Sequence, residues 1–581
     1  MLRILSILWA FSLSNAAWAQ LSELEATRIA ETILSNQNPL VVVEEISHDG
    51  LFIASEGNGY AVVVNGPRLP GRDAFMEAME FTLRPIDGDQ VQVQITSLPQ
   101  TVETATGGAL TLRPTLFKGI FSRADRGFQS LQLGISDLVY VHPEATLSIG
   151  RFETDLRKER GVYELTIFVQ DFQSDIQDTI DVKETAEAFT FMLSIDANQG
   201  NGGDLLFIAN ALLELITGPG QEDTNTLGKD RPLPADLMGL EFEVALEGLE
   251  TLWLALMDQG ARRTISQTSL GDVFIRGGIV PDEAGQARAN INFGLNDIRL
   301  ITPDSLVSGS ADIFSLEVTM DGLDSRLISQ LFSDADKAQT MALSRLIGGM
   351  SVLEVYALGK QIDLSVPSDE AFFQLMQGDF YFSVSSPTPD APNEKDISLG
   401  LDLRDLRGDY PSETTALEPA WSAFVKPILP QVLDLNIDVS AFPGELWKGL
   451  AGIFMDTQAF PQDRGSPRGR PTLSLDGTLF QSELINARLN GGVTYNPDAQ
   501  FQAVGEIEMI LNNLRPLIGA MQRGARVENR TISQALTLGS IGLATIMSMA
   551  ERTEDGQMRF VFDLGEAGLP KINGKDLPVR F

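Results

Sequence analysis

Histidines are scarce in this 581-residue chain, which limits the chemistry that its side chains can perform. Only His48 and His142 are present, so a Ser-His-Asp triad or a histidine-ligated metal would have to use one of them. Both lie beside residues typical of turns, which favours surface roles. The chain has no cysteine, and this excludes disulfides, thiolate metal sites and cysteine nucleophiles. The sequence therefore predicts no catalytic residue, no cofactor site and no metal site.

Carboxylates are abundant, with 79 Asp and Glu residues. Glycoside hydrolysis needs two of them facing each other across a sugar, but spacing alone selects no pair among so many. Asp409 and Glu413 lie beside an aromatic residue in "DYPSE", but a solvated loop is strongly favoured there. The segment Asp196–Asp204 has the oxygen-bearing side chains of a calcium loop, but Phe207 stands at its twelfth position instead of an acid. An ordinary glycine-rich turn is favoured there.

The charge balance is strongly acidic, since 43 basic and 79 acidic residues give a formal net charge of −36. Such a surface is repelled by nucleic acid and by anionic lipid headgroups, so no nucleic-acid partner is expected. With 5 Trp and 7 Tyr, the chain is also lean in the aromatic residues on which carbohydrate binders stack sugars.

The first residues have the features of an export signal. Arg3 precedes the apolar run Ile4–Leu13, and Ala17-Trp18-Ala19 forms a small-x-small cleavage site. We expect residues 1–19 to be a cleaved signal peptide, which leaves no stable transmembrane anchor. A periplasmic location follows from this expectation, with secretion as the alternative.

The stretch Val432–Phe454 changes its apolar period partway. Up to Val439, apolar and polar residues alternate, which predicts a half-buried strand. Beyond Pro443, apolar residues recur every three to four positions, which predicts a helix. The same change occurs in residues 241–258, 312–332 and 501–521.

Four strand-to-helix units are thus predicted, each with an apolar helix stripe. Their stripes supply the candidate apolar groove: Leu249, Leu252, Leu256, Leu327, Leu331, Leu446, Leu450, Phe454, Leu517 and Met521. The pentapeptide "RTISQ" occurs at both Arg263–Gln267 and Arg530–Gln534, which gives mild support to an internal repeat. The alternative is that each helix only seals its own sheet.

The remaining sequence reads mostly as strands. A hairpin is predicted around Gly161, and a three-strand meander within 471–509 with turns at Asp476-Gly477 and Asn496-Pro497. Ser22 and Glu25 have the pattern of a capping box that starts a short helix. The predicted fold class is α+β and predominantly β, with long twisted antiparallel sheets and repeated amphipathic helices packed on one face.

Polar segments rich in Pro and Gly suggest where the chain divides. They give an N-terminal β-rich region with a leading helix, a central strand–helix region and a C-terminal strand–helix region, at 20–217, 237–384 and 397–581. Long loops within one continuous sheet are the equal alternative.

Two segments resemble a known family. The first is "LSLDGTLFQSELINARLNGGVTY" with "GEIEMILNNLRPLI", and the second is the closing "GLPKINGKDLPVRF" with Asn573, Gly574 and Leu577. They resemble uncharacterised secreted alphaproteobacterial proteins. More loosely, the pattern is similar to the AsmA-like envelope proteins, whose long curved sheets carry an apolar groove associated with lipid transport. The resemblance covers 433–581 and carries over no functional residue. If the signal peptide is cleaved, the chain has no counterpart of the membrane-anchoring helix common in AsmA-like proteins.

Taken together, these features predict a non-enzymatic envelope protein that binds a lipid or another apolar envelope component in an elongated groove. Two alternatives stay open at this point. One is a structural or assembly factor of the envelope that acts through an exposed sheet edge. The other is a carboxylate-dependent enzyme that acts on glycans.

Overall fold

The computed structural model of the chain describes two units. It covers residues 21–34, 48–69, 74–75, 78–97, 100–103, 108–124, 127–159, 161–177, 180–197, 237–256, 262–281, 286–302, 307–324, 349–366, 371–386, 394–409, 420–444, 447, 470–512, 514–527, 529–567 and 569–576. One unit comprises Met1–Thr264 and Asp272–Pro281, and the other comprises Ile265–Gly271 and Asp282–Phe581. Strand β14 (Arg262–Pro281) contributes residues to both. The predicted signal peptide lies outside the described residues, and the predicted region boundaries stay predictions.

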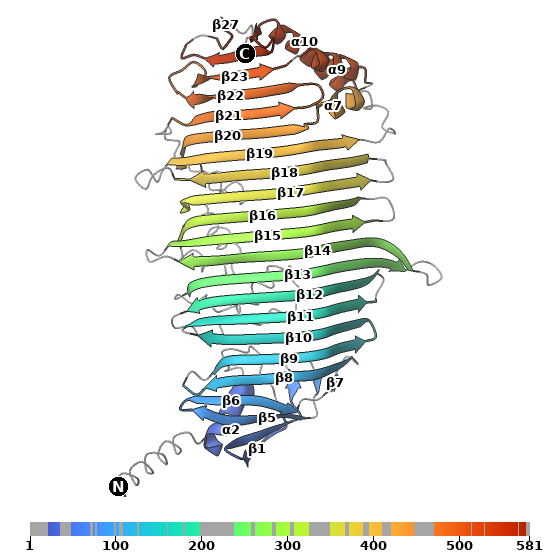
Figure 1. Cartoon of the computed structure of the whole chain (residues 1–581), viewed down its shortest axis with the longest axis vertical. Coiled ribbons are helices and arrows are strands. Elements are labelled where there is room, and N and C mark those ends of the chain that lie inside the picture. Colours follow the sequence, from blue (N-terminus) through green and yellow to red (C-terminus); the bar gives the residue numbers. More distant parts are fainter. Residues whose placement is uncertain are drawn as a thin grey trace, which may run out of the picture. The chain divides into compact units, whose positions relative to one another are not determined.

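The first unit is an antiparallel sheet in which strands that follow each other along the chain mostly pair (Figure 1). Its strands are β1 (Gly50–Glu56), β2 (Gly59–Asn65), β3 (Arg68–Leu69), β4 (Ala74–Phe75), β5 (Ala78–Asp87), β6 (Gln90–Ser97), β7 (Thr101–Glu103), β8 (Ala109–Ser122), β9 (Gly127–His142), β10 (Ala145–Glu159), β11 (Val162–Ile176), β12 (Ile180–Ala197) and β13 (Leu237–Leu256). The predicted hairpin around Gly161 is confirmed, because β10 pairs with β11 from Glu159–Val162 outward.

Helix α2 (Glu23–Leu34) begins at the predicted capping box. The Ser22 amide donates to Glu25 Oε2 at 3.0 Å, and the Glu25 amide donates back to Ser22 Oγ at 3.3 Å. These bonds satisfy backbone donors that a helix leaves unpaired at its start. The bonds that the Ser22 amide and hydroxyl donate to Glu25 Oε2 lower the pKa of Glu25, with Arg123 as a further favourable charge. Along the helix, Ala26, Ile29, Ala30 and Leu34 are buried.

The second unit is also antiparallel, and its successive strands are neighbours (Figure 1). Its remaining strands are β15 (Gln286–Ile301), β16 (Ser308–Asp324), β17 (Val352–Val366), β18 (Ala371–Ser385), β19 (Glu394–Asp409), β20 (Val432–Pro443), β21 (Thr472–Gln481), β22 (Asn486–Tyr495), β23 (Ala503–Leu511), β24 (Glu551–Arg552), β25 (Met558–Leu564), β26 (Lys571–Ile572) and β27 (Lys575–Asp576). The predicted meander is confirmed as β21, β22 and β23.

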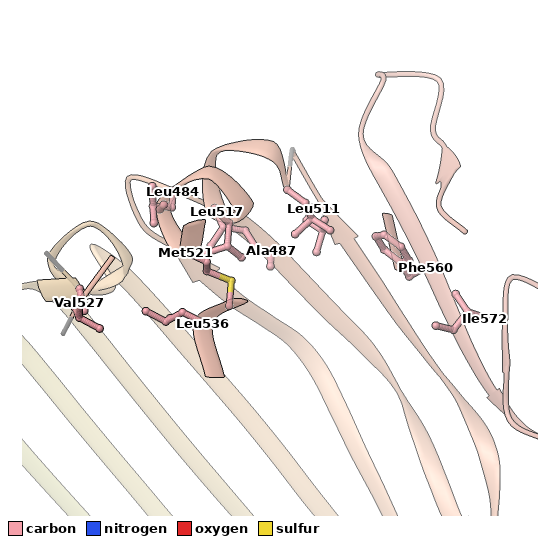
Figure 2. Packing of buried hydrophobic residues seen from close by; sticks show 13 residues of the cluster. Leu484, Ala487, Leu511, Leu517, Met521, Val527, Leu536, Phe560 and Ile572 are labelled. Atoms are coloured by element: carbon pink, nitrogen blue, oxygen red, sulfur yellow. The ribbon is translucent and has the colours of Figure 1, made fainter. Parts of the chain in front are cut away.

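Helices gather at the C-terminal strands of this unit. They are the π-helix η3 (Trp421–Val425) and the α-helices α7 (Lys426–Ile428), α9 (Arg515–Gly524) and α10 (Arg530–Met547). Leu517 and Met521 on α9 pack with Leu536 on α10 and with Leu511 and Phe560 of the sheet (Figure 2). This cluster covers the last strands of the sheet with apolar side chains.

The predominantly β, antiparallel fold is therefore confirmed, whereas the repeated helix packing is not. Only the predicted helix at the end of residues 501–521 is confirmed, as α9. In 241–258 the prediction is wrong, because β13 continues as one strand and carries Leu249, Leu252 and Leu256. Of the units at 312–332 and 432–454, the described residues include the strands β16 and β20, while the predicted helix residues Leu327, Leu331, Leu446, Leu450 and Phe454 lie outside them.

A single left-handed residue explains why the apolar residues of β13 have the spacing of a helix in the sequence. Gly248 has a φ of +62° in the middle of the strand. Such a residue locally breaks the alternation of side chains between the two faces, as a bulge does. Leu246 and Leu249 are then three residues apart without any helix, which is the spacing that the sequence analysis interpreted as helical.

The same device recurs at regular places in both units. In the first unit Asp137 on β9 and Asp171 on β11 have φ values of +51° and +55°. In the second unit Asp297, Gln361 and Asp405, on β15, β17 and β19, have φ values of +50° to +51°. From β9 to β19, every second strand thus carries one left-handed residue in its interior. We call the line that these left-handed residues form across the strands of one unit a crease.

The repeated pentapeptide does not mark a structural repeat. Arg263–Gln267 lies in strand β14, whereas Arg530–Gln534 forms the first turns of helix α10. The predicted turn at Asp476-Gly477 is also wrong, because β21 runs through it with a register shift between Leu475 and Thr478. In each case the neighbouring strands or helices decide the local conformation.

The first prediction tests the crease at Asp171, whose side chain is exposed. Asp171→Val is expected to lower the free energy of unfolding by about 1–2 kcal/mol, because a β-branched residue is strained in the left-handed region. Asp171→Gly should stay within about 1 kcal/mol of the parent, since glycine adopts this φ freely. Chemical denaturation followed by circular dichroism measures both.

Gln173→Val is the matched control, because Gln173 is exposed on the same strand but has no left-handed backbone. It should be neutral or slightly stabilising. Equal losses for Asp171→Val and Gln173→Val would contradict the crease.

The second prediction concerns the capping box. Ser22→Ala is expected to destabilise α2 by about 0.5–2 kcal/mol at pH 7. Because the folded pKa of Glu25 is lowered, this stabilisation is complete above the unfolded pKa, and it is lost as the pH falls through the folded pKa. Amide hydrogen exchange of α2 should therefore separate Ser22→Ala from the parent at pH 7 much more than at pH 2. An equal separation at both pH values would be inconsistent with this account, and Ser22→Thr, which keeps the hydroxyl, is the control.

Candidate functional site

Strand register in the second unit gathers apolar side chains on one face of the sheet. Residues that face each other across an antiparallel pair lie on the same side of the sheet. Apolar residues therefore form rows that cross strands β15 to β20. One such row consists of Ile291, Val318, Val355, Phe382, Leu399 and Ile437. We call the surface formed by these rows the apolar face.

The apolar face extends over several parallel rows of this kind. Its members are Ala289, Ile291, Phe293, Leu295, Phe314, Leu316, Val318, Met320, Leu353, Val355, Ala357, Phe380, Phe382, Val384, Ile397, Leu399, Leu401, Leu403, Leu433, Leu435, Ile437 and Val439. Phe293 and Phe314 meet edge-on, with ring centroids 6.3 Å apart. Aromatic and branched residues thus dominate this side of six adjacent strands.

The intervening residues form the opposite, polar face. Its rows include Asn290, Asn292, Glu317, Thr319, Glu354, Tyr356, Asp379, Tyr381, Ser383, Ser398, Asp402, Asp434, Asn436 and Asp438. Tyr356 donates its hydroxyl to Asp379 at 2.8 Å, and this bond, together with partial burial, raises the pKa of Tyr356. Asn436 Nδ2 donates to Asp434 at 2.8 Å. Neighbouring polar side chains therefore accommodate the carboxylates of Asp379 and Asp434 here.

Burial differs across the apolar face. Val384 is 1% exposed, and beside it Trp447 packs its ring 6.4 Å from that of Phe382. By contrast, Ile291 is 42% and Phe314 37% exposed. A sheet whose apolar side is fully covered would not leave such side chains in solvent, so part of this face is accessible.

The apolar face continues across the crease of the second unit. A Cβ built on Gly359 would lie 2.8 Å from Ile362 Cδ1, and one on Gly378 would lie 2.9 Å from Leu375 Cδ2. Residues three apart therefore share a face here, which two-residue alternation cannot produce. Beyond the crease, Leu364 and Phe373 pair directly and are 43% and 41% exposed. Because of the crease, the apolar surface stays on one side along the strands.

The first unit shows the same division between faces. One row consists of Leu131, Leu156, Leu165, Leu193 and Phe242, and the first four of these are buried. The opposite face carries ion pairs between Arg151 and Glu153, Arg157 and Asp155, and Arg276 and Glu243. A hollow on this face is lined by charged and apolar side chains together, among them Glu153, Asp155, Arg157, Leu116 and Phe168. It is open to solvent and mixes polar with apolar contacts.

The structure places the predicted groove residues in three different settings. Leu249 and Leu252 are half-buried on strand β13, which also carries Leu256. Leu517 and Met521, at 7% and 9% exposed, belong to the core cluster, as the alternative of a sealing helix expects. The other five lie outside the described residues. The sequence analysis names only residues of the predicted helix stripes as groove residues, although the alternation that it found in 289–295 and 433–439 marks an apolar side of the sheet.

The residues that the sequence analysis considered for catalysis or metal binding lie at the surface or make contacts within the fold. His142 ends strand β9, stacks on Tyr140 with ring centroids 6.3 Å apart, and accepts the Glu144 amide at Nδ1. His48 is exposed. Asp409 pairs with Lys426 and accepts Trp421 Nε1 at 3.3 Å, which anchors η3 and α7 to β19. Among the described residues, no group of three His, Cys, Asp or Glu residues is placed to hold a metal ion.

Glu413 and most of the calcium-like segment lie outside the described residues. Within the described part of the chain, no helix is both long enough and apolar enough to cross a membrane. No protein-family model matches the chain, and no match to a curated protein or to a solved structure was found.

The third prediction tests how the crease packs. Gly378→Val is expected to lower the free energy of unfolding by about 1–3 kcal/mol, because the new side chain must displace Leu375 and crowd Leu403. Gly400→Val on the polar face is the matched control. A Cβ there lies no closer than 3.5 Å to its neighbours, so the substitution should be nearly neutral. Thermal unfolding of both variants measures the difference, and equal shifts would refute this packing.

Proposed function

We propose that this chain is a non-enzymatic envelope protein that binds a lipid or a similar long apolar molecule along the apolar face of β15–β20. The observation that supports the proposal most directly is the set of uninterrupted apolar rows across six neighbouring strands, with exposed aromatic and branched side chains among them. Isolated exposed apolar residues are ordinary on protein surfaces, but contiguous apolar patches are typical of binding sites.

The dimensions of the face suit an acyl chain. Adjacent strands lie ~4.8 Å apart, so six strands span roughly 24 Å across the rows. Each methylene removed from water contributes about 0.8 kcal/mol, so a long chain lying along a row would gain affinity without any specific polar contact. Binding of this kind requires neither a cofactor nor a catalytic group.

The chemistry of the two faces supports carriage over catalysis. Acids on the polar face lie on the side of the sheet opposite to the apolar rows, so a molecule on the apolar face would not meet them. Export through the predicted signal peptide would place the protein in the periplasm, where lipids and other apolar envelope components are available. The loose similarity of residues 433–581 to AsmA-like proteins agrees with this proposal.

The fourth prediction tests ligand binding directly. The mature protein, purified from a bacterial periplasm without detergent, is expected to carry a lipid-sized adduct in native mass spectrometry, and solvent extraction identifies it. In the double variant Ile291→Gln/Phe314→Gln the bound fraction should fall at least tenfold, since each buried apolar side chain contributes about 1.5–3 kcal/mol. Both residues are partly exposed in the free protein, so the fold should survive.

Tyr381→Gln is the matched control, because Tyr381 is 39% exposed but lies on the polar face. It should keep the adduct. A clean apo mass for the folded parent would count against carriage, and an equal loss in Tyr381→Gln would exclude the apolar face as the binding surface.

A further inference from the structure

Helix α10 presents an apolar surface to solvent. Leu538 is 69% and Ile541 58% exposed, the highest values among the large apolar residues that the structure describes in the second unit. They lie on one side of the helix with Gln534 and Thr545, at positions i, i+4, i+7 and i+11, while Leu536 and Ser540 face the core. No charged residue occurs from 531 to 550. The exposed side of α10 is therefore apolar or neutral along its whole length after Arg530.

The chain around the start of α10 has a net positive charge, opposite in sign to that of the whole protein. Between 514 and 550 there are four arginines and a single acid, Glu528, whereas the chain as a whole has a net charge of −36. The arginines are Arg515, Arg523, Arg526 and Arg530, and all four are exposed. Arg530 lies on the same side of α10 as Ile541, eleven residues away, so a basic end and an apolar stretch share one surface.

Packing holds this surface in a fixed orientation. The Asn529 side chain caps α10 by accepting the Thr531 and Ile532 amides at 3.1 and 3.2 Å. Ser533 Oγ donates to the Ala525 carbonyl at 2.6 Å, which joins α10 to the end of α9. Gly539 lets the helices cross closely, because a Cβ there would lie 2.4 Å from Met521 Cε. Leu538 and Ile541 are thus directed outward by the core on the opposite side.

We propose that the exposed side of α10, together with Arg523, Arg526 and Arg530, binds the surface of an anionic lipid bilayer. A helix with a rim of basic residues and an apolar face is the type that lies in the membrane interface. The net charge does not oppose this, because at physiological ionic strength charges interact only within about 8 Å. Near the start of α10 the exposed arginines outnumber the single acid Glu528, and the next acid along the chain, Glu551, follows the far end of the helix. A bilayer that touches the start of α10 therefore meets a locally basic surface.

The fifth prediction is tested by flotation of the full mature protein with vesicles. Binding is expected with vesicles that contain phosphatidylglycerol, and much less with phosphatidylcholine alone. Leu538→Asp/Ile541→Asp should abolish flotation. Arg526→Gln should weaken it about fivefold, which corresponds to the ~1 kcal/mol that one basic residue contributes near an anionic surface. Leu24→Asp on α2 is the matched control, since Leu24 is 63% exposed on an acidic helix, and it should float like the parent.

Four outcomes would overturn the proposal. The first is that the parent does not float, and the second is that Leu538→Asp/Ile541→Asp and Arg526→Gln both float like the parent. The third is that Leu24→Asp loses as much flotation as the α10 double variant. The fourth is that the α10 double variant still binds vesicles but no longer self-associates. If a variant does not fold, the salt dependence of the parent's flotation tests the proposal instead. Flotation that stays unchanged from 0.05 to 0.5 M salt would exclude the arginines as the groups that bind the bilayer. The experiment is independent of ligand carriage, because α10 and the apolar face of β15–β20 share no residue.

Discussion

Antiparallel register is the constraint on which the rest of this structure depends. Every interior strand must pair its backbone donors and acceptors with two neighbours, and this fixes which side chains face one another. Once Ile291 faces Val318 and Val318 faces Val355, the parity of each strand assigns all its other residues to a side. A slip by one residue would carry a whole strand's apolar residues to the charged side, so the division between faces also protects the register.

Long strands make the creases necessary. Strands of 15 to 20 residues accumulate twist, and a left-handed residue on every second strand from β9 to β19 gives each unit a regular place to bend. Asp, Gly and Gln occupy these positions, and the short polar side chains among them tolerate positive φ better than branched ones. Because alternation changes at the same place on neighbouring strands, the apolar side remains apolar on both sides of the crease.

The sheet also needs protected ends. At the C-terminal end, Asn573 and Gly574 have φ values of +49° and +74° and turn β26 into β27 as a tight hairpin. Asn573 Oδ1 accepts the Val561 amide at 2.8 Å, and its Nδ2 donates to the Met549 and Arg559 carbonyls at 2.9 Å. One side chain thus pairs part of the β25 edge and ties it to the end of α10. The helical cluster that covers this end also holds the basic, apolar surface proposed to meet a bilayer.

The sequence by itself determined the features that depend on near neighbours. Ser22 with Glu25 predicted a helix start, Gly161 a hairpin, and 471–509 a meander, because each signal acts within a few residues. It also determined the alternation that makes one side of β15–β20 apolar. Tertiary structure decided whether a glycine ends a strand or only bends it, since the strands that contain Gly248 and Gly477 pair with their neighbours on both sides of these glycines. It likewise decided that "RTISQ" is a strand at 263–267 and a helix at 530–534. The backbone partners that settle these conformations come from strands or helices elsewhere in the fold, and spacing along the chain does not identify them.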